Sequence, residues 1–212
     1  MVAHHLQPQP LALLSITGIP TFRHSFFNSS TLISSELPTE SRVQKCLEGP
    51  LCVGTRPEGD LTIFDPASLT ESGTKRLTYE RPEPAQNILE YDAKNPRKGL
   101  YSYLMYKNAF VPLLESIDLG YEWAKTNPQG SKLAQWPATV FIQGDNDHDV
   151  NADVTIQVAR DLGQGKARLI IAEGQGHLFE ATSFLKDTGV GMDAVRRAIK
   201  ELDEVLSHHH KG

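Results

Sequence analysis

The sequence predicts an α/β fold in which a short parallel β-sheet is flanked by helices and carries a large, mainly helical insertion. Apolar runs at 138–144 and 167–174 have the length and β-branched content of buried strands. Each is followed by a segment with helical periodicity, at 152–163 and 192–206. Strand, helix, strand and helix in close succession produce parallel strands joined by a right-handed crossover.

Composition limits the classes of protein that this chain can belong to. It has 212 residues, of which 39% are hydrophobic and 22% charged, as in a globular protein with one sizeable core. Lys and Arg total 21 against 26 Asp and Glu, a net charge of −5. Nucleic acids and anionic membranes bind basic surfaces, so we expect neither as a partner. No apolar run approaches the ~18 residues that span a bilayer, so no membrane span is expected.

The beginning of the chain supplies a third strand to the same core. Residues 1–6 suggest a short helical fragment, and the apolar segment 11–18 predicts a strand buried on both faces. We therefore assign 1–19 and 136–212 together to the α/β core.

The segment between these parts, 20–135, has a different character. Ten of the 13 prolines fall between Pro20 and Pro128, which excludes a regular alternation of strands and helices. Its best helical pattern runs from 99 to 117, with Pro112 expected to kink or restart the helix. We predict that 20–135 is one long insertion into the core.

Two polar loops follow the strands at 138–144 and 167–174. The first contains Asp147 and the second contains His177. Function in an open parallel sheet gathers at the carboxyl ends of its strands, so both side chains are expected at one sheet edge. A carboxylate bonded to one ring nitrogen of a histidine fixes its tautomer and stabilises the imidazolium. Asp147 and His177 are thus candidate acid and base residues of nucleophilic catalysis.

The same loops resemble those of the α/β-hydrolase superfamily, particularly its microbial and fungal esterase- and peptidase-like branches. The chain has Gly144-x-x-Asp147-x-x-Val150 after one strand and Gly174-x-Gly176-His177 after the next. The resemblance implies that Asp147 and His177 are the acid and base of a serine-hydrolase triad, of the carboxylesterase or peptidase type. It also implies hydrolysis of an ester or peptide-like acyl substrate without a cofactor. Residues 20–135 then correspond to the cap, or lid, and the chain's first residues to the helix after the nucleophile and the next strand.

The nucleophile that the resemblance requires is missing. The 212 residues contain no G-x-S-x-G elbow and no H-G-G run for an oxyanion hole. If the start of the chain is aligned correctly, the elbow falls just upstream of Met1. We expect a truncated or catalytically incomplete hydrolase, and favour a fragment over a pseudoenzyme or a site completed by another chain. A small acyl substrate is the expected partner only if the site is completed.

Other hydroxyl and thiol groups lack the setting of a nucleophile. Ser15 and Thr17 fall in the predicted strand rather than on an elbow. The remaining candidates lie in the insertion, with no strained turn to activate them: Ser29, Ser30, Ser102, Cys46 and Cys52.

The acidic run 145–149 suggests an alternative of a different class, a non-catalytic ligand- or metal-binding module. A D-x-D-x-D pattern begins EF-hand calcium loops, which need Gly at the sixth position and Glu at the twelfth. Those positions hold Val150 and Ile156. We assign no metal ligand, and keep the module as the alternative function.

Three further features leave questions open. Cys46 and Cys52 do not have a zinc spacing, and whether they pair is undecided. A strand near 11–17 without its neighbour leaves an apolar edge, so self-association is expected there. The first twenty residues lack the features of a secretory signal, which favours the cytoplasm but does not establish it.

Overall fold

A computed structural model describes residues 8–28, 37–48, 99–126, 133–181 and 183–209. The chain divides into two compact units, one of 1–33 with 104–212 and the other of 34–103. Both boundaries lie inside the segment that we predicted as the insertion. The predicted helical fragment 1–6 lies outside the described residues.

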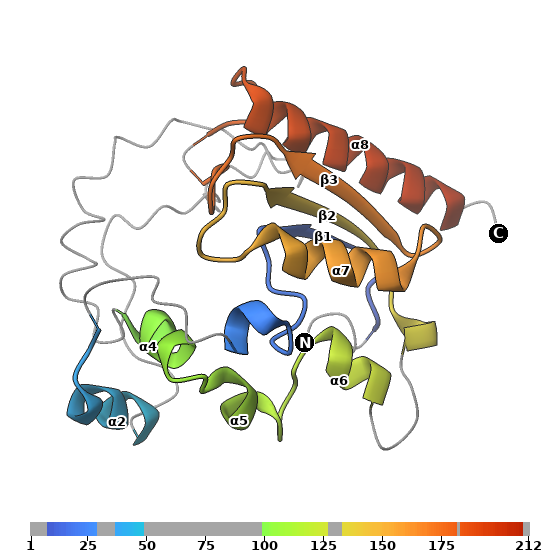
Figure 1. The fold of residues 1–212 in the computed structure, drawn as a ribbon. Helices are drawn as coiled ribbons and strands as arrows, with labels where there is room; N and C mark the ends of the chain where they lie inside the picture. The colour runs from blue at the N-terminus through green and yellow to red at the C-terminus, as the bar shows by residue number, and fades with distance from the viewer. Residues whose placement is uncertain (1–7, 29–36, 49–98, 127–132, 182, 210–212) are drawn as a thin grey trace, which may run out of the picture. The chain divides into compact units, whose positions relative to one another are not determined.

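The first unit is built on a sheet of three parallel strands in the order β1-β2-β3 (Figure 1). They are β1 (Ala12–Ile16), β2 (Ala138–Gly144) and β3 (Ala167–Ala172). Ala12 lies opposite Ala138, and Thr139 lies opposite Ala167. The predicted short parallel sheet with flanking helices is therefore present.

Two helices cover opposite faces of this sheet: α7 (Ala152–Leu162) and α8 (Val190–His209) (Figure 1). Successive side chains of a strand point to opposite faces. Val140 and Ile142 of β2 accordingly pack with α8, whereas Phe141 packs on the α7 side. Because both faces are covered, the central strand is almost entirely buried, which explains its continuous apolar run.

The predicted elements of the C-terminal part are confirmed, with changes at their ends. The helix that we predicted at 192–206 extends from Val190 to His209. Residues 207–209, beyond the end of the predicted helix, form its last turn. Helical hydrogen bonding thus continues past the last apolar position of the pattern.

The helix predicted over 99–117 is in fact two helices, α4 (Leu100–Tyr106) and α5 (Phe110–Leu114). The break lies at Asn108, whose φ is +52°, and not at Pro112. Pro112 occupies the first turn of α5, where its missing N–H has no helical acceptor to lose. Asn is among the few residues that tolerate the left-handed region, which makes it a suitable point to end a helix.

The prediction that the strand at 11–18 is buried on both faces was wrong. β1 lies at the edge of the sheet, and its residues are half-buried except Leu14, which is 37% exposed. Among the described residues, only β2 pairs with it.

The first unit also contains further short helical segments. They are η1 (Ser25–Asn28), α6 (Tyr121–Thr126) and η3 (Leu133–Gln135). Thr21 forms an antiparallel bridge with Gly120, and Tyr121 donates its backbone N–H to Pro20 O at 2.8 Å. Tyr121 also contacts Trp136 edge-on in the α7-side core. This part of the predicted insertion therefore contributes directly to the core of the first unit.

The second unit is described only in part. Its helix α2 (Glu40–Glu48) contains the buried Val43 and also Cys46, and begins after Thr39, whose hydroxyl accepts the backbone N–H of Arg42. Cys52 lies outside the described residues, so the pairing question stays open.

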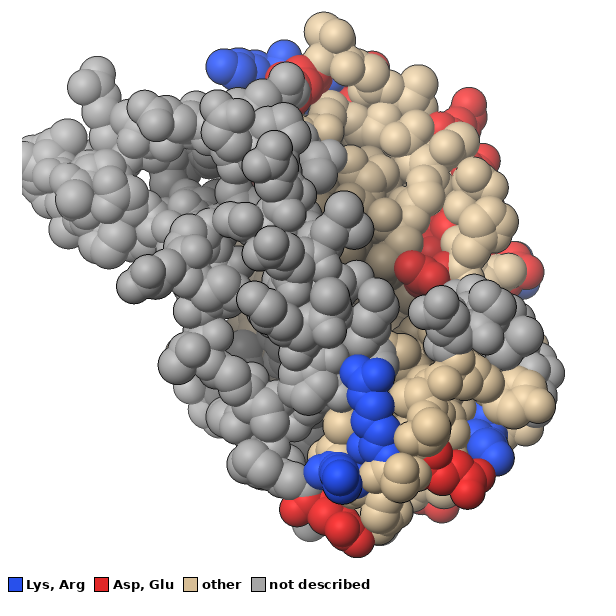
Figure 2. All heavy atoms as spheres, turned by 90° about the vertical axis from the view of Figure 1, so that its left-hand side faces the viewer, with Lys and Arg blue, Asp and Glu red and all other residues tan. Residues whose placement is uncertain are grey.

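On the face shown in Figure 2, Lys, Arg, Asp and Glu side chains of the described residues lie among uncharged ones without forming a continuous basic patch. Within the described part of the chain, no helix is long and apolar enough to cross a membrane.

The bridge at Gly120 yields a stability prediction. A Cβ at Gly120 would lie 2.2 Å from Pro20 O, and its φ is +85°. Gly163 also has a positive φ, +76°, but a Cβ there meets nothing within 4 Å. We expect Gly163→Ala to cost about 1–3 kcal/mol from backbone strain alone. Gly120→Ala should cost about 1–3 kcal/mol more, because the backbone must also move apart.

Urea unfolding of the two variants beside the wild type measures this difference. Equal losses in the free energy of unfolding would contradict the close approach of Gly120 to Pro20.

Candidate functional site

Asp147 lies in the loop that joins β2 to α7. Its Oδ1 accepts the backbone N–H groups of Asp149 and Val150, both at 2.9 Å. These bonds form a local turn of the kind that Asp favours. The loop ends at Asn151, whose side chain caps α7 by accepting the N–H of Asp153 at 2.8 Å. The sequence of the loop thus directs the chain straight from the strand into the helix.

The loop that carries His177 leaves the carboxyl end of the neighbouring strand, β3, and is bonded to the first loop. The backbone N–H of Asn146 donates to Gln175 O at 3.0 Å, and the N–H of Gly174 donates to Asp145 Oδ1 at 2.6 Å. Gly144 permits this contact, since a Cβ there would lie 2.2 Å from Gln175 O. Hydrogen bonds therefore join the two loops at residues that precede His177 in the sequence.

The two residues predicted as acid and base meet at this edge of the sheet. His177 Nδ1 lies 2.9 Å from Asp147 Oδ2. The Asp147 side chain is 0% exposed, whereas that of His177 is 27% exposed. The carboxylate is thus fully buried, whereas the imidazole that contacts it is partly exposed.

The hydrogen bonds to Asp147 show which of the two atoms, His177 Nδ1 or Asp147 Oδ2, carries the hydrogen of their contact. Asp147 receives four donors: two backbone N–H groups on Oδ1, and Gln143 Nε2 at 2.8 Å with His177 Nδ1 on Oδ2. An ionised carboxylate is an acceptor only, and four lone-pair sites match four donors. Because an ionised carboxylate oxygen can only accept, the hydrogen of this contact belongs on Nδ1. Nε2 then carries a lone pair, and it hydrogen-bonds to none of the described residues.

The chain turns sharply after the histidine. Leu178 has φ of +51°, in the left-handed region, and is 52% exposed. This conformation costs a residue with a Cβ about 1–2 kcal/mol. The following Phe179 is partly buried and packs against the α8-side core, so the turn lies between the partly exposed histidine and a residue that contacts the core.

Two candidate nucleophiles named from the sequence, Ser15 and Thr17, are described in the same unit as this pair, and neither hydrogen-bonds to it. Ser15 lies in β1 and Ser102 in α4. Thr17 follows β1 with φ of +47°, but it is only 3% exposed, and its hydroxyl has no hydrogen-bond partner in the described part of the chain. Because Thr17 is buried, a substrate cannot contact its hydroxyl. Ser29 and Ser30 lie outside the described residues.

The acidic loop does not gather its carboxylates around one point. Asp145 bonds to Gly174 and Asp147 to the donors above. Among the described residues, no three His, Cys, Asp or Glu side chains are grouped so that they could hold a metal ion.

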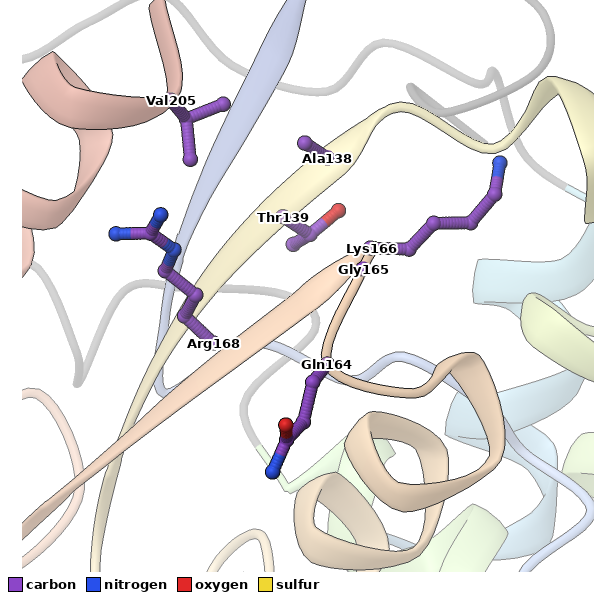
Figure 3. Close-up of a pocket in the computed structure, with 7 residues that line it drawn as sticks. All are labelled: Ala138, Thr139, Gln164, Gly165, Lys166, Arg168 and Val205. Carbon is purple, nitrogen blue, oxygen red and sulfur yellow. The ribbon is translucent and has the colours of Figure 1, made fainter. Parts of the chain in front are cut away.

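A cavity of about 210 Å³ lies at the other end of the strands, near Ala138 and Lys166 (Figure 3). The Lys166 amine donates to the carbonyls of Ala134 and Trp136, at 2.7 and 2.8 Å. The Arg168 guanidinium pairs with Glu201 and Glu204, and these hydrogen bonds raise its pKa. Both cations are already engaged, and they extend in different directions (Figure 3).

Comparisons of the chain with models of protein families, with curated proteins and with solved structures found no match. The site is therefore interpreted from its own geometry.

Sequence reasoning missed one residue of the site, Gln143, and the hydroxyl that bonds to the far side of its amide. Gln143 is fully buried at the end of β2, and Thr155 of α7 donates its hydroxyl to Gln143 Oε1 at 3.1 Å. The signal was present, because an amide within an apolar buried strand needs polar partners.

The contact at Gly144 yields the second prediction. We expect Gly144→Ala to lower the free energy of unfolding by about 1–3 kcal/mol, because the new methyl overlaps the Gln175 carbonyl. It should also speed hydrogen exchange of the Asn146 amide, which bonds to that carbonyl. Gly165→Ala is the matched control, since its Cβ meets nothing within 4 Å. It should change stability by less than about 0.5 kcal/mol. Unchanged Asn146 exchange in Gly144→Ala would contradict the close approach.

Proposed function

We propose that this chain is an α/β-hydrolase-type protein whose Asp147 and His177 are the acid and base of acyl hydrolysis. One observation carries the proposal: the 2.9 Å contact between His177 Nδ1 and a fully buried carboxylate, at the carboxyl edge of a parallel sheet. The substrates would be esters or peptide-like acyl compounds, and no cofactor is needed for this chemistry.

The geometry supports a division of roles between the two side chains. With the proton on Nδ1, the His177 Nε2 lone pair can remove a proton from an attacking hydroxyl. The imidazolium that forms is stabilised by the Asp147 carboxylate, which keeps its own charge. Nε2 can then return the proton to the leaving group of the acyl compound.

The pair lacks the other half of such a site in this chain. Since the sequence has no G-x-S-x-G, we propose that no serine acyl-enzyme forms on it. A missing oxyanion-hole donor alone costs about 2.7–4 kcal/mol of transition-state stabilisation. Acid and base without nucleophile and oxyanion hole therefore make a catalytically incomplete site.

This incompleteness gives the third prediction. The purified chain is expected to show no labelling by a fluorophosphonate probe and negligible hydrolysis of p-nitrophenyl esters. Intact-mass and gel-based detection of the probe provide the measurement, with an active serine esterase as the positive control. Stoichiometric labelling of any serine would overturn the proposed absence of a nucleophile.

The basic Nε2 of His177 gives the fourth prediction. Diethyl pyrocarbonate acylates an unprotonated imidazole nitrogen. In Asp147→Asn, an amide N–H facing Nδ1 favours the opposite tautomer, with its hydrogen on Nε2. We expect acylation of His177 to slow by about tenfold, the effect of a ~1.4 kcal/mol change. Peptide mass spectrometry measures the rate at each histidine.

His24 is an internal control for this experiment. Its Nδ1 accepts the backbone N–H of Phe26 at 3.1 Å, so its neutral ring carries the hydrogen on Nε2. Its acylation rate should be the same in both proteins. An unchanged rate at His177 would contradict the proposed role of Asp147.

We also propose that the chain self-associates through β1. The strand is an edge in the described sheet, and Leu11 and Leu14 are 57% and 37% exposed. Residues 6–22 carry no charged side chain, whereas edge strands are commonly protected by charge. The β1 strand of a second copy of this chain can pair with this edge, because it offers the same unpaired backbone N–H and C=O groups.

Leu14→Lys tests this proposal, as the fifth prediction. A lysine on the edge strand should shift the chain toward monomer, because a charge would have to be buried in the association. Leu113→Lys is the matched control, since Leu113 is 39% exposed on α5, away from the sheet edge. Sedimentation velocity over a concentration series measures the change. A wild type that stays monomeric at all concentrations rejects association through β1.

A further inference from the structure

We infer that Gln143 is a positioning residue for the Asp147–His177 pair, which holds the carboxylate oxygen that accepts the imidazole N–H. The inference rests on the proposed function, because it assigns Gln143 its role through His177. Gln143 itself does not reach the imidazole; it acts on the carboxylate between them.

The burial of Gln143 requires an explanation. Its side chain is 0% exposed, in a strand whose other central residues are apolar. A buried amide is costly unless its polar atoms are bonded. Both ends of this amide are bonded: Nε2 donates to Asp147 Oδ2 and to Val150 O, and Oε1 accepts the Thr155 hydroxyl.

The orientation of the amide follows from its partners. A backbone carbonyl only accepts, so the group that faces Val150 O at 3.0 Å must be the NH₂. The same nitrogen lies 2.8 Å from Asp147 Oδ2. The Thr155 hydroxyl can donate or accept and imposes no constraint of its own. The amide is thereby fixed with its donors toward the acid loop.

These bonds close a ring around the carboxylate. Gln143 joins Asp147 Oδ2 to the Val150 carbonyl, while the Val150 N–H donates to Asp147 Oδ1. Rotation of the carboxylate breaks bonds on both oxygens at once. Oδ2 has a second acceptor site that Gln143 does not use, and His177 Nδ1 occupies it.

The chemistry of an amide suits this position. Gln143 supplies a hydrogen bond to the charged oxygen without a proton that can be transferred. The one mobile proton is then confined to the line between Oδ2 and Nδ1. Because Gln143 holds the carboxylate and does not titrate, it keeps His177 in the tautomer that leaves Nε2 unprotonated.

The test compares Gln143→Met with Thr155→Val in the full chain. Met keeps the length and volume of Gln but donates nothing to Asp147. Val keeps the shape of Thr and removes the hydroxyl on the far side of the amide, leaving both donors in place. Long-range ¹H–¹⁵N spectra report the tautomer of each histidine and the solvent exchange of the Nδ1 proton, with His177 assigned by its loss in His177→Gln and His24 as the opposite-tautomer reference.

The wild type should show His177 protonated on Nδ1. In Gln143→Met, exchange of that proton should accelerate by about tenfold, the size of a lost hydrogen bond to a charged group. Thr155→Val should leave it within about twofold of the wild type, even if both variants melt at similarly lowered temperatures. A purely structural Gln143 predicts equal changes in the two variants, and that result overturns the inference.

A second measurement needs no variant that might fail to fold. If one closed ring holds both groups, the side-chain N–H protons of Gln143 and the Nδ1 proton of His177 should be protected from exchange to a similar degree in the wild type, each measured relative to the free amide or imidazole. Protection of the Gln143 protons at least tenfold weaker than that of the Nδ1 proton would overturn the inference. An Nε2-protonated His177 in the wild type would instead reject the proposed function, so the two failures are distinguishable.

Discussion

The buried carboxylate of Asp147 is the group on which the rest of this structure depends. Removing a charge from water costs several kcal/mol unless donors replace the lost hydration. Four donors from four different residues meet this one group, and each comes from an element that the fold has to place correctly. The end of β2, the loop before α7 and the loop after β3 therefore have one arrangement that leaves no charge unpaired.

The parallel sheet makes that arrangement available. Because β2 and β3 are neighbours and run in the same direction, their carboxyl ends open into adjacent loops. Gly144 then lets the second loop approach the first closely, since it has no Cβ to meet Gln175 O. The two helices on opposite faces bury the central strand, so the amide of Gln143 lies where water cannot replace its partners. Fold and site are consequences of the same packing.

How far the sequence predicts this molecule depends on how local each signal is. β2 and β3 were predicted from the length and composition of their apolar runs and α7 from its helical periodicity. The meeting of Asp147 and His177 was predicted from the rule for parallel strands. The break at Asn108 was missed because Pro112 is the stronger local signal, although a proline in a first turn does no harm. The exposure of Leu14 depends on which strands surround β1, and the role of Gln143 on residues up to 12 positions away. Neither can be derived from periodicity.

The two oxygens of Asp147 separate what the loop needs from what the histidine needs. Oδ1 accepts two backbone N–H groups, which is sufficient to form the turn that leads into α7. An aspartate that served only this turn could leave its second oxygen in water at no cost. Oδ2 is instead fully buried, and it is bonded to a buried amide on one side and to a partly exposed imidazole on the other. The desolvation of Oδ2 adds nothing to the turn. What it stabilises is one tautomer and one orientation of His177, which the proposed role of this histidine as a base in acyl transfer requires.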